Sequence, residues 1–92
     1  MIGKYGLLYE TYLKTHRRII YTNLLTAGTL QEHLADIDTQ ANERLECLMK
    51  QMVAAQDITE ALKAADQMAW VGAMNNIKAC AEEIVLKEIV YA

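Results

Sequence analysis

The stretch that decides the fold is residues 57–91, which read DITEALKAADQMAWVGAMNNIKACAEEIVLKEIVY. It contains no proline and a single glycine, so we predict one unbroken helix from Asp57 to Tyr91. Asp57 followed by Glu60 has the spacing of a capping box, in which side chains satisfy the free backbone N–H groups of a first turn. Such a helix would be about 50 Å long, whereas a compact domain of this size is about 25 Å across. We therefore expect it to pack along another long helix.

The composition of the whole chain favours an all-α fold. The 92 residues include no proline and four glycines, and helix-forming residues dominate. This length makes one domain, residues 1–92. The hydrophobic fraction of 53% exceeds the usual ~45–50%. We expect a second copy to cover the excess apolar surface, which predicts a dimer.

A second long helix is predicted from Leu30 to Ala55. Thr29 and Glu32 form another capping box at its start. Its apolar stripe repeats over 11 residues, which favours straight packing over a left-handed coil. The stripe consists of Leu30, Leu34, Ile37, Ala41, Leu45, Leu48 and Met52. A tight connection at Gln56–Asp57 would return the chain and make the two long helices an antiparallel hairpin.

Two short helices are predicted before this hairpin. After an irregular lead, Met1–Gly6, the first spans Leu7–Thr15, and the second spans His16–Ala27 with Thr15 as its cap. Gly28 has the position of a left-handed residue that ends a helix. The buried face of the second helix is predicted to consist of Ile19, Ile20, Leu24 and Ala27. The predicted architecture is a small helical bundle, with the two short helices packed on the hairpin.

The last helix is apolar over a wide arc, so it should contact more than one neighbour. We interpret Trp70 and the methionines Met49, Met52, Met68 and Met74 as core; the alternative is an adaptable binding groove. Cys47 and Cys80 lack metal-site or redox spacing and are expected to be reduced and buried in a cytoplasmic protein. The N-terminus has no signal-peptide pattern, and the longest apolar run is too short to span a membrane.

Charge is distributed unevenly along the chain and marks the candidate site. Residues 1–27 carry a net charge of +3, residues 28–57 carry −4 and residues 58–92 carry −2. The candidate nucleic-acid contact is the basic run with its neighbouring tyrosine: Lys14, His16, Arg17, Arg18 and Tyr21. The alternative is a solvated helix junction in which Arg17 and Arg18 pair with the acidic third helix. By themselves, four cations would bind DNA weakly and with strong salt dependence.

Other kinds of site are poorly supported. A helix-turn-helix around Gly28 would place the acidic residues Glu32 and Asp36 in the groove, where a recognition helix needs donors and cations. Neither nucleotide-binding nor hydrolase motifs occur, and the two histidines lack the pattern of a di-iron bundle. We therefore predict no enzyme activity, metal or cofactor. A partly buried Asp66 and an Asn75 or Asn76 that fixes helix register are interpreted as structural features.

Several blocks of sequence resemble one family along nearly the whole chain, from Ile2 to Ala92. They are Tyr5-Gly6, Tyr12-Leu13-Lys14, His16-Arg17-Arg18, His33-Leu34-Ala35-Asp36-Ile37-Asp38, Asp57-Ile58-Thr59-Glu60, Leu62 to Val71, Met74-Asn75, Ala81 to Val85 and Ile89-Val90-Tyr91. Together they are similar to the transposon-encoded protein TnpV family of mobilisable and conjugative elements. Members of that family carry a further N-terminal segment, which we expect to be absent here.

The resemblance implies a place beside a site-specific recombinase, but it brings no catalytic residues. The chain is too small to be the recombinase, because tyrosine and serine recombinases need a much larger catalytic domain. We therefore expect a non-enzymatic accessory protein of a mobile element that interacts with proteins, such as a second copy, the recombinase or a host factor. The alternative is a small DNA-binding accessory factor that assists excision through the basic junction.

Overall fold

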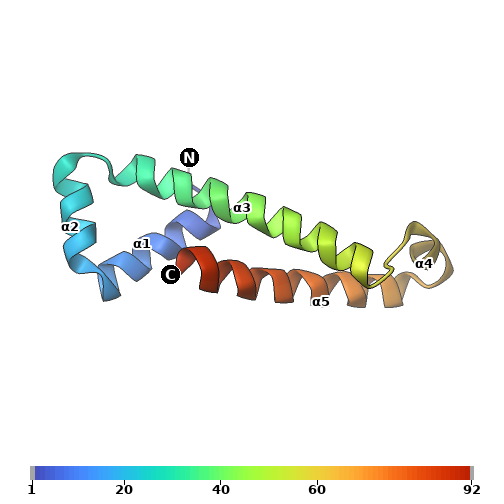
Figure 1. Ribbon diagram of the computed structural model, residues 1–92. Helices are drawn as coiled ribbons and strands as arrows, with labels where there is room; N and C mark the ends of the chain where they lie inside the picture. Colours follow the sequence, from blue (N-terminus) through green and yellow to red (C-terminus); the bar gives the residue numbers. More distant parts are fainter. Residues whose placement is uncertain (1, 92) are drawn as a thin grey trace.

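The computed structural model describes residues 2–91, and its elements are all helical over that range. They are α1 (Lys4–His16), α2 (Arg18–Ala27), α3 (Leu30–Ala55), α4 (Glu60–Ala65), α5 (Gln67–Val85) and a final π-helical turn, η1 (Leu86–Val90). The molecule is elongated, with extents of 55 × 21 × 18 Å (Figure 1). Its radius of gyration is 16.8 Å, compared with about 12 Å expected for a compact domain of this length. Much of its apolar surface therefore has no partner within the chain.

The core lies at the centre of this long molecule, where α1, α3, α5 and η1 meet. Its buried residues are Tyr5, Ala41, Leu48, Ala81, Val85 and Val90. The predicted bounds of the helix Leu30–Ala55 are confirmed. Its stripe faces the core as predicted: Leu30, Leu34, Ala41 and Leu48 are buried, and the other three members are half-buried. Apolar periodicity was a sufficient guide here because the helix has neighbours along most of its length.

The prediction of one unbroken helix from Asp57 to Tyr91 is wrong. The backbone of Asp66 is extended (φ −149°, ψ 89°) and separates α4 from α5. The Asp66 carboxylate accepts a hydrogen bond from the Ala69 N–H at 3.1 Å, so this residue caps α5. A short polar side chain that can bond nearby backbone groups offers an alternative to continuing the helix. Asp66 is also exposed, which contradicts the partly buried carboxylate expected there.

Asp57 does not begin a helix, because it belongs to the end of α3. Its φ of 59° is left-handed, and its N–H donates to the Ala54 carbonyl at 3.4 Å. The Ile58 N–H donates to the Val53 carbonyl at 3.1 Å, which completes a Schellman motif. Thr59 is instead the cap of α4, and its hydroxyl accepts from the Leu62 N–H at 3.2 Å. The connection between the long helices is therefore not a tight turn but includes all of α4.

Helix α1 begins three residues earlier than predicted because a side chain from another helix caps it. Gly3 is the N-cap and has no side chain of its own to accept a hydrogen bond. The Asp38 carboxylate of α3 supplies the acceptor, and the Gly6 N–H donates to it at 3.0 Å. A Cβ on Gly6 would lie 3.0 Å from the Leu34 carbonyl oxygen, so glycine allows the two backbones to approach. A long-range contact of this kind leaves no local signal in the sequence.

Helix α2 departs most from the predicted packing. Thr15 does not cap it: the Thr15 hydroxyl donates back to the Thr11 carbonyl at 2.9 Å, and Arg17 occupies the junction (φ −136°, ψ 52°). The left-handed Gly28 is confirmed, with φ 76° in a second Schellman motif. Figure 1 shows α2 turned away from the long axis at one end. All of α2 is described, and none of its residues is buried, so the expected buried face is wrong.

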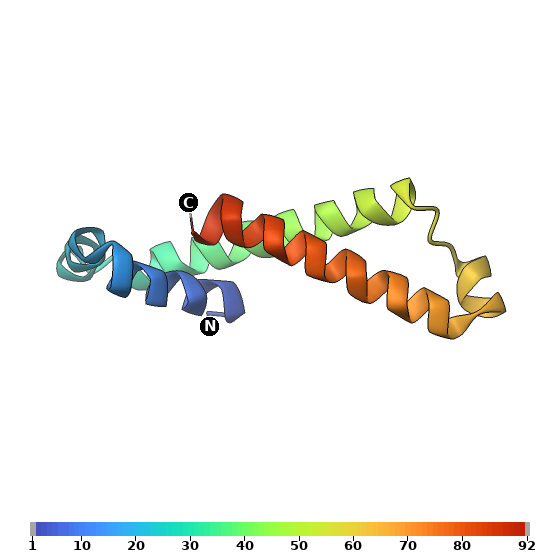
Figure 2. The same cartoon turned by 90° about the horizontal axis from the view of Figure 1, so that it is seen from below.

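The opposite end of the molecule is also loosely packed. Figure 2 shows α3 and α5 diverging from the centre, with α4 bridging their far ends. Trp70 is half-buried there, and the Lys63 ammonium lies 4.7 Å from the centre of its ring. Met49, Met52 and Met74 are half-buried, whereas Met68 is 81% exposed. The interpretation of these residues as core holds in part for Met49 and Met52, which pack against the central core, and is wrong for Met68.

Candidate functional site

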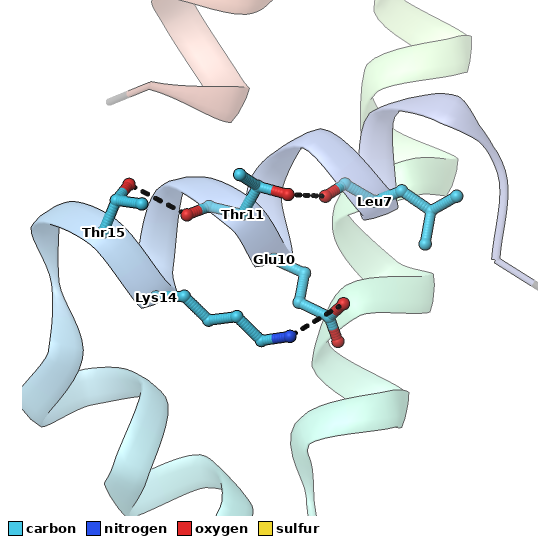
Figure 3. A network of polar contacts seen from close by, with 5 residues as sticks. All are labelled: Leu7, Glu10, Thr11, Lys14 and Thr15. Carbon is cyan, nitrogen blue, oxygen red and sulfur yellow. Dashed lines mark hydrogen bonds and ion pairs between the residues drawn. The ribbon is translucent and has the colours of Figure 1, made fainter.

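The five residues of the predicted nucleic-acid contact lie at the junction of α1 and α2, at one end of the molecule. Lys14 lies on α1 and forms an ion pair with Glu10 at 3.7 Å (Figure 3). Its ammonium also lies 5.5 Å from the centre of the Tyr21 ring of α2. The cation and the tyrosine are thus brought together, but each already has a partner within the chain.

The next residue of the run, His16, belongs to a small aromatic cluster. Its ring centre lies 5.4 Å from that of Tyr12, and Tyr12 lies 5.3 Å from Tyr91 at the other end of the chain. A cavity of about 370 Å³ is lined by this cluster and the neighbouring face of α1: Leu8, Thr11, Tyr12, Thr15, His16 and Tyr91. On that face the Thr11 and Thr15 hydroxyls donate to the carbonyls of Leu7 and Thr11 (Figure 3).

Arg17 and Arg18 are the exposed cations of the junction. Within residues 2–91 neither forms an ion pair, so the expected pairing with the acidic third helix is wrong. The long-range ion pairs of the chain involve other residues: Lys4 with Glu82 and Arg44 with Glu88. Two adjacent guanidinium groups are thus available to phosphate or to carboxylates of another molecule.

Histidine and tyrosine side chains also meet between α1 and α3. The Tyr9 hydroxyl and His33 Nε2 form a hydrogen bond of 3.1 Å. Burial raises the pKa of the Tyr9 hydroxyl, and the nearby Arg17 charge opposes that effect. The group therefore remains protonated near neutral pH and links the two helices. Within the described residues, no three His, Cys, Asp or Glu side chains gather in a way that could hold a metal ion.

Helix α2 carries an apolar face that is largely exposed in the single chain. Ile19 is 78% exposed, Ile20 42% and Leu25 56%, while Leu24 is half-buried. These four residues, here called the α2 face, adjoin Arg17 and Arg18. Four aliphatic side chains on ten residues are typical of a helix that packs against something. The helical pattern was therefore recognised, but the packing partner was wrongly sought within the chain.

A second apolar surface lies at the other end, between α3 and the α4–α5 segment. It is a groove of about 540 Å³, here called the α3–α5 groove. Its apolar lining comes from Leu45, Met49, Val53, Ala54, Ile58 and Met74. Glu46, Lys50 and Asp57 form its charged rim. The methionines were a usable signal, because flexible methionine side chains are common at adaptable binding surfaces.

The cysteines and the asparagines of the last helix do not lie where the sequence predicts them. Cys47 and Cys80 are exposed, so the expectation of buried thiols is wrong. Asn75 and Asn76 are exposed on α5 and do not fix the register of the helices. None of the helices in the part of the chain that the structure describes is both long and apolar enough to cross a membrane.

Comparison with known proteins places the chain in a family. Neither a curated protein nor a solved structure matches it. One family model does match, described as transposon-encoded protein TnpV, and the match covers residues 1–90. The matched range includes the helix junction, the α2 face and the α3–α5 groove. The resemblance seen in the sequence is confirmed: the chain belongs to the TnpV family of transposon-encoded proteins.

Proposed function

We propose that this transposon-associated protein is a non-enzymatic accessory factor that acts by binding other proteins. The observation that carries the proposal is the apolar surface at both ends of the molecule, above all the α2 face. A helix with three strongly exposed aliphatic residues is costly to leave in water, whereas a protein partner would bury them. The proposal requires no cofactor or metal.

A second copy of the chain is the first partner we propose, with the long helices α3 and α5 providing part of the contact. The element's recombinase and a host protein are the further candidates. A mobile element excises and integrates in the compartment that holds the chromosome, so the proposed place of action is the cytoplasm.

The experiment that tests this proposal measures the oligomeric state of the protein and its capture of a protein partner. Sedimentation equilibrium at several concentrations should give the mass of a dimer, and immobilised protein should retain the recombinase encoded by the same element. Leu25→Glu should weaken both interactions if the α2 face is the contact. Leu7→Glu is the matched control, since Leu7 is 54% exposed on α1 and lies outside both apolar surfaces. A monomer that retains no protein partner would contradict the proposal.

The second candidate function is DNA binding through Lys14, His16, Arg17, Arg18 and Tyr21. The observation that favours it is the pair of exposed arginines without an ion pair in residues 2–91. Titration of the element's ends and of random duplex at several salt concentrations tests it. A log–log salt slope of about −2 to −4 would correspond to a few phosphate contacts.

Arginine substitutions make that titration specific. Arg17→Ala/Arg18→Ala should abolish binding and flatten the salt slope. The control is Lys50→Ala/Lys78→Ala, which removes the same charge from α3 and α5, two helices that do not form the junction. Equal losses in both variants would indicate a non-specific effect of net charge and contradict the assigned contact. Absence of binding at low salt would leave protein binding as the function to pursue.

A further inference from the structure

The two apolar surfaces lie at opposite ends of a molecule 55 Å long. Helix α2 lies at one end of the molecule, and the ends of α3 and α5 next to α4 lie toward the other (Figures 1 and 2). The α3–α5 groove is lined by residues from that second end. One surface is a protruding helix and the other is a concavity between helices. An amphipathic helix that lays its apolar residues into a groove is a common mode of protein recognition. Because of their separation, α2 cannot occupy the groove of its own chain.

The dimensions of the two surfaces agree. The ten residues of α2 make a helix about 15 Å long. On α3, the groove lining runs from Asn42 to Ala54, a stretch of about 20 Å, so the groove is long enough to hold the whole of α2. The α2 face carries aliphatic side chains, and the groove offers methionines that adapt to such shapes.

Their charges are complementary as well. From His16 to Thr29 the chain contains no acidic residue, and Arg17 and Arg18 lie at the start of α2. At the groove end, Asp57 lines the rim and Glu60 begins α4, while Lys50 of the rim is paired with Glu46 at 3.3 Å. Within residues 2–91, neither the Asp57 nor the Glu60 carboxylate forms an ion pair. Exposed cations beside α2 thus correspond to exposed carboxylates beside the groove. These charges favour binding of α2 in the groove of another copy and disfavour contact between two α2 helices.

We propose that two copies of the chain form a reciprocal dimer in which the α2 face of each copy fills the α3–α5 groove of the other. This inference rests on the proposed self-association and names the surfaces that produce it. A two-fold axis across the middle of the long molecule brings the α2 end of one copy to the groove end of its partner. The same axis makes the second, identical contact at the other end. The assembly is therefore closed, with both apolar surfaces covered, and does not grow into a filament.

Cross-linking tests the arrangement directly. On a Cys47→Ser/Cys80→Ser background, Ile19→Cys protein is mixed with Met49→Cys protein of different mass and treated with a short bis-maleimide. The expected product is the mixed dimer. Ile19→Cys alone should not cross-link, because a reciprocal dimer holds its two α2 helices at opposite ends. Leu7→Cys mixed with Met49→Cys is the control and should give no product.

Each outcome of the cross-linking experiment decides between arrangements. Ile19→Cys cross-linked to itself would indicate a contact between two α2 helices and overturn the proposal. A dimer mass without the Ile19–Met49 product would overturn the arrangement while leaving self-association standing. A monomer in sedimentation would overturn both. A monomer whose capture of the recombinase is lost on Met49→Glu would show that the groove binds a different protein.

Charge reversal provides an independent test, because substitutions at these exposed positions should leave the fold unchanged. One variant carries Arg17→Glu/Arg18→Glu, and the other carries Asp57→Asn/Glu60→Lys; asparagine is chosen because it accepts the left-handed backbone of position 57. In a reciprocal dimer each variant alone repels itself at both contacts, and we expect its dimer dissociation constant to rise about tenfold or more. The mixture forms two complementary contacts and should recover a heterodimer. Variants that keep their circular dichroism and melting behaviour but give no recovery on mixing would overturn the proposal.

Discussion

The centre and the ends of this molecule use the same kinds of residue to different effect. At the centre, Leu48 and Val85 are buried where α1, α3, α5 and η1 meet. At the ends, Ile19 and Leu25 carry equally apolar side chains but remain exposed. The difference shows that apolar spacing along a helix specifies a face and leaves its partner open. In this protein the central faces are covered within the chain, and we propose that the terminal ones are covered by another copy.

The largest expected effect comes from truncating one leucine in each region. Leu48→Ala should lower the free energy of unfolding by about 3 kcal/mol, because it leaves a cavity in the core. Leu25→Ala should change it by at most about 0.5 kcal/mol, since the side chain is exposed in the single chain. Urea denaturation, followed by circular dichroism at concentrations below the dimer dissociation constant, measures both. Similar losses of unfolding free energy in the two variants would mean that α2 is packed within the monomer. The centre and the ends of the molecule would then not differ.

The cap that attaches α1 to the centre should have the next largest effect. Asp38→Ala removes the acceptor of the Gly6 N–H and a negative charge at the start of α1, so we expect a loss of about 1–2 kcal/mol. Asp36→Ala is the control, because Asp36 is exposed on the same helix. Thermal unfolding compares the two. Equal stability of both variants would argue against a cap supplied by α3.

The groove end can be stabilised by relieving the left-handed backbone of Asp57. Asp57→Gly should raise the free energy of unfolding by up to about 1 kcal/mol, because glycine adopts the left-handed conformation without a steric penalty. The same change at the exposed helical position Asp36 should instead lower stability by a similar amount. Chemical denaturation measures the change in the free energy of unfolding and shows whether it is positive or negative for each variant. Destabilisation by Asp57→Gly would favour the helix start at Asp57 that the sequence pattern predicts.

The smallest effect is expected at the basic junction. Glu10→Gln breaks the exposed pair with Lys14 and should cost no more than about 0.5 kcal/mol. Adding 0.5 M salt should remove most of that difference, since surface pairs are screened. A larger, salt-independent loss would show that the junction is a stabilising part of the fold, comparable with the centre.

The sequence was a good guide to the long third helix and to the glycine turn. The helix Leu30–Ala55 has its predicted bounds because its apolar stripe and the absence of Gly and Pro extend over the same residues. Gly28 ends α2 as predicted, because a left-handed turn needs a residue without a Cβ. The Asp57–Glu60 pattern misled because Asp also tolerates that same conformation, so its role depends on which helix end it follows.

The candidate site was predictable only in part. The basic run from Lys14 to Arg18 and Tyr21 was found from residue type, and the structure places all of it at one junction. Its electrostatic state was not predictable: Lys14 is paired with Glu10, whereas Arg17 and Arg18 remain exposed. The α2 face and the α3–α5 groove were read as core, because sequence periodicity cannot distinguish a face buried within a chain from one left for a partner.

By itself, then, the sequence determined the all-α class, the long third helix, the glycine turn and the family, all of which depend on residue type and short-range spacing. Only the tertiary structure decided that Asp38 caps α1, that Asp66 divides the last helix and that the two ends carry uncovered apolar surfaces. For the cap on α1 and the uncovered surfaces, the physical reason is distance along the chain, whereas Asp66 acts locally through the Ala69 N–H three residues on. Hydrogen bonds and packing between residues far apart in sequence depend on where whole helices lie, which no local pattern specifies.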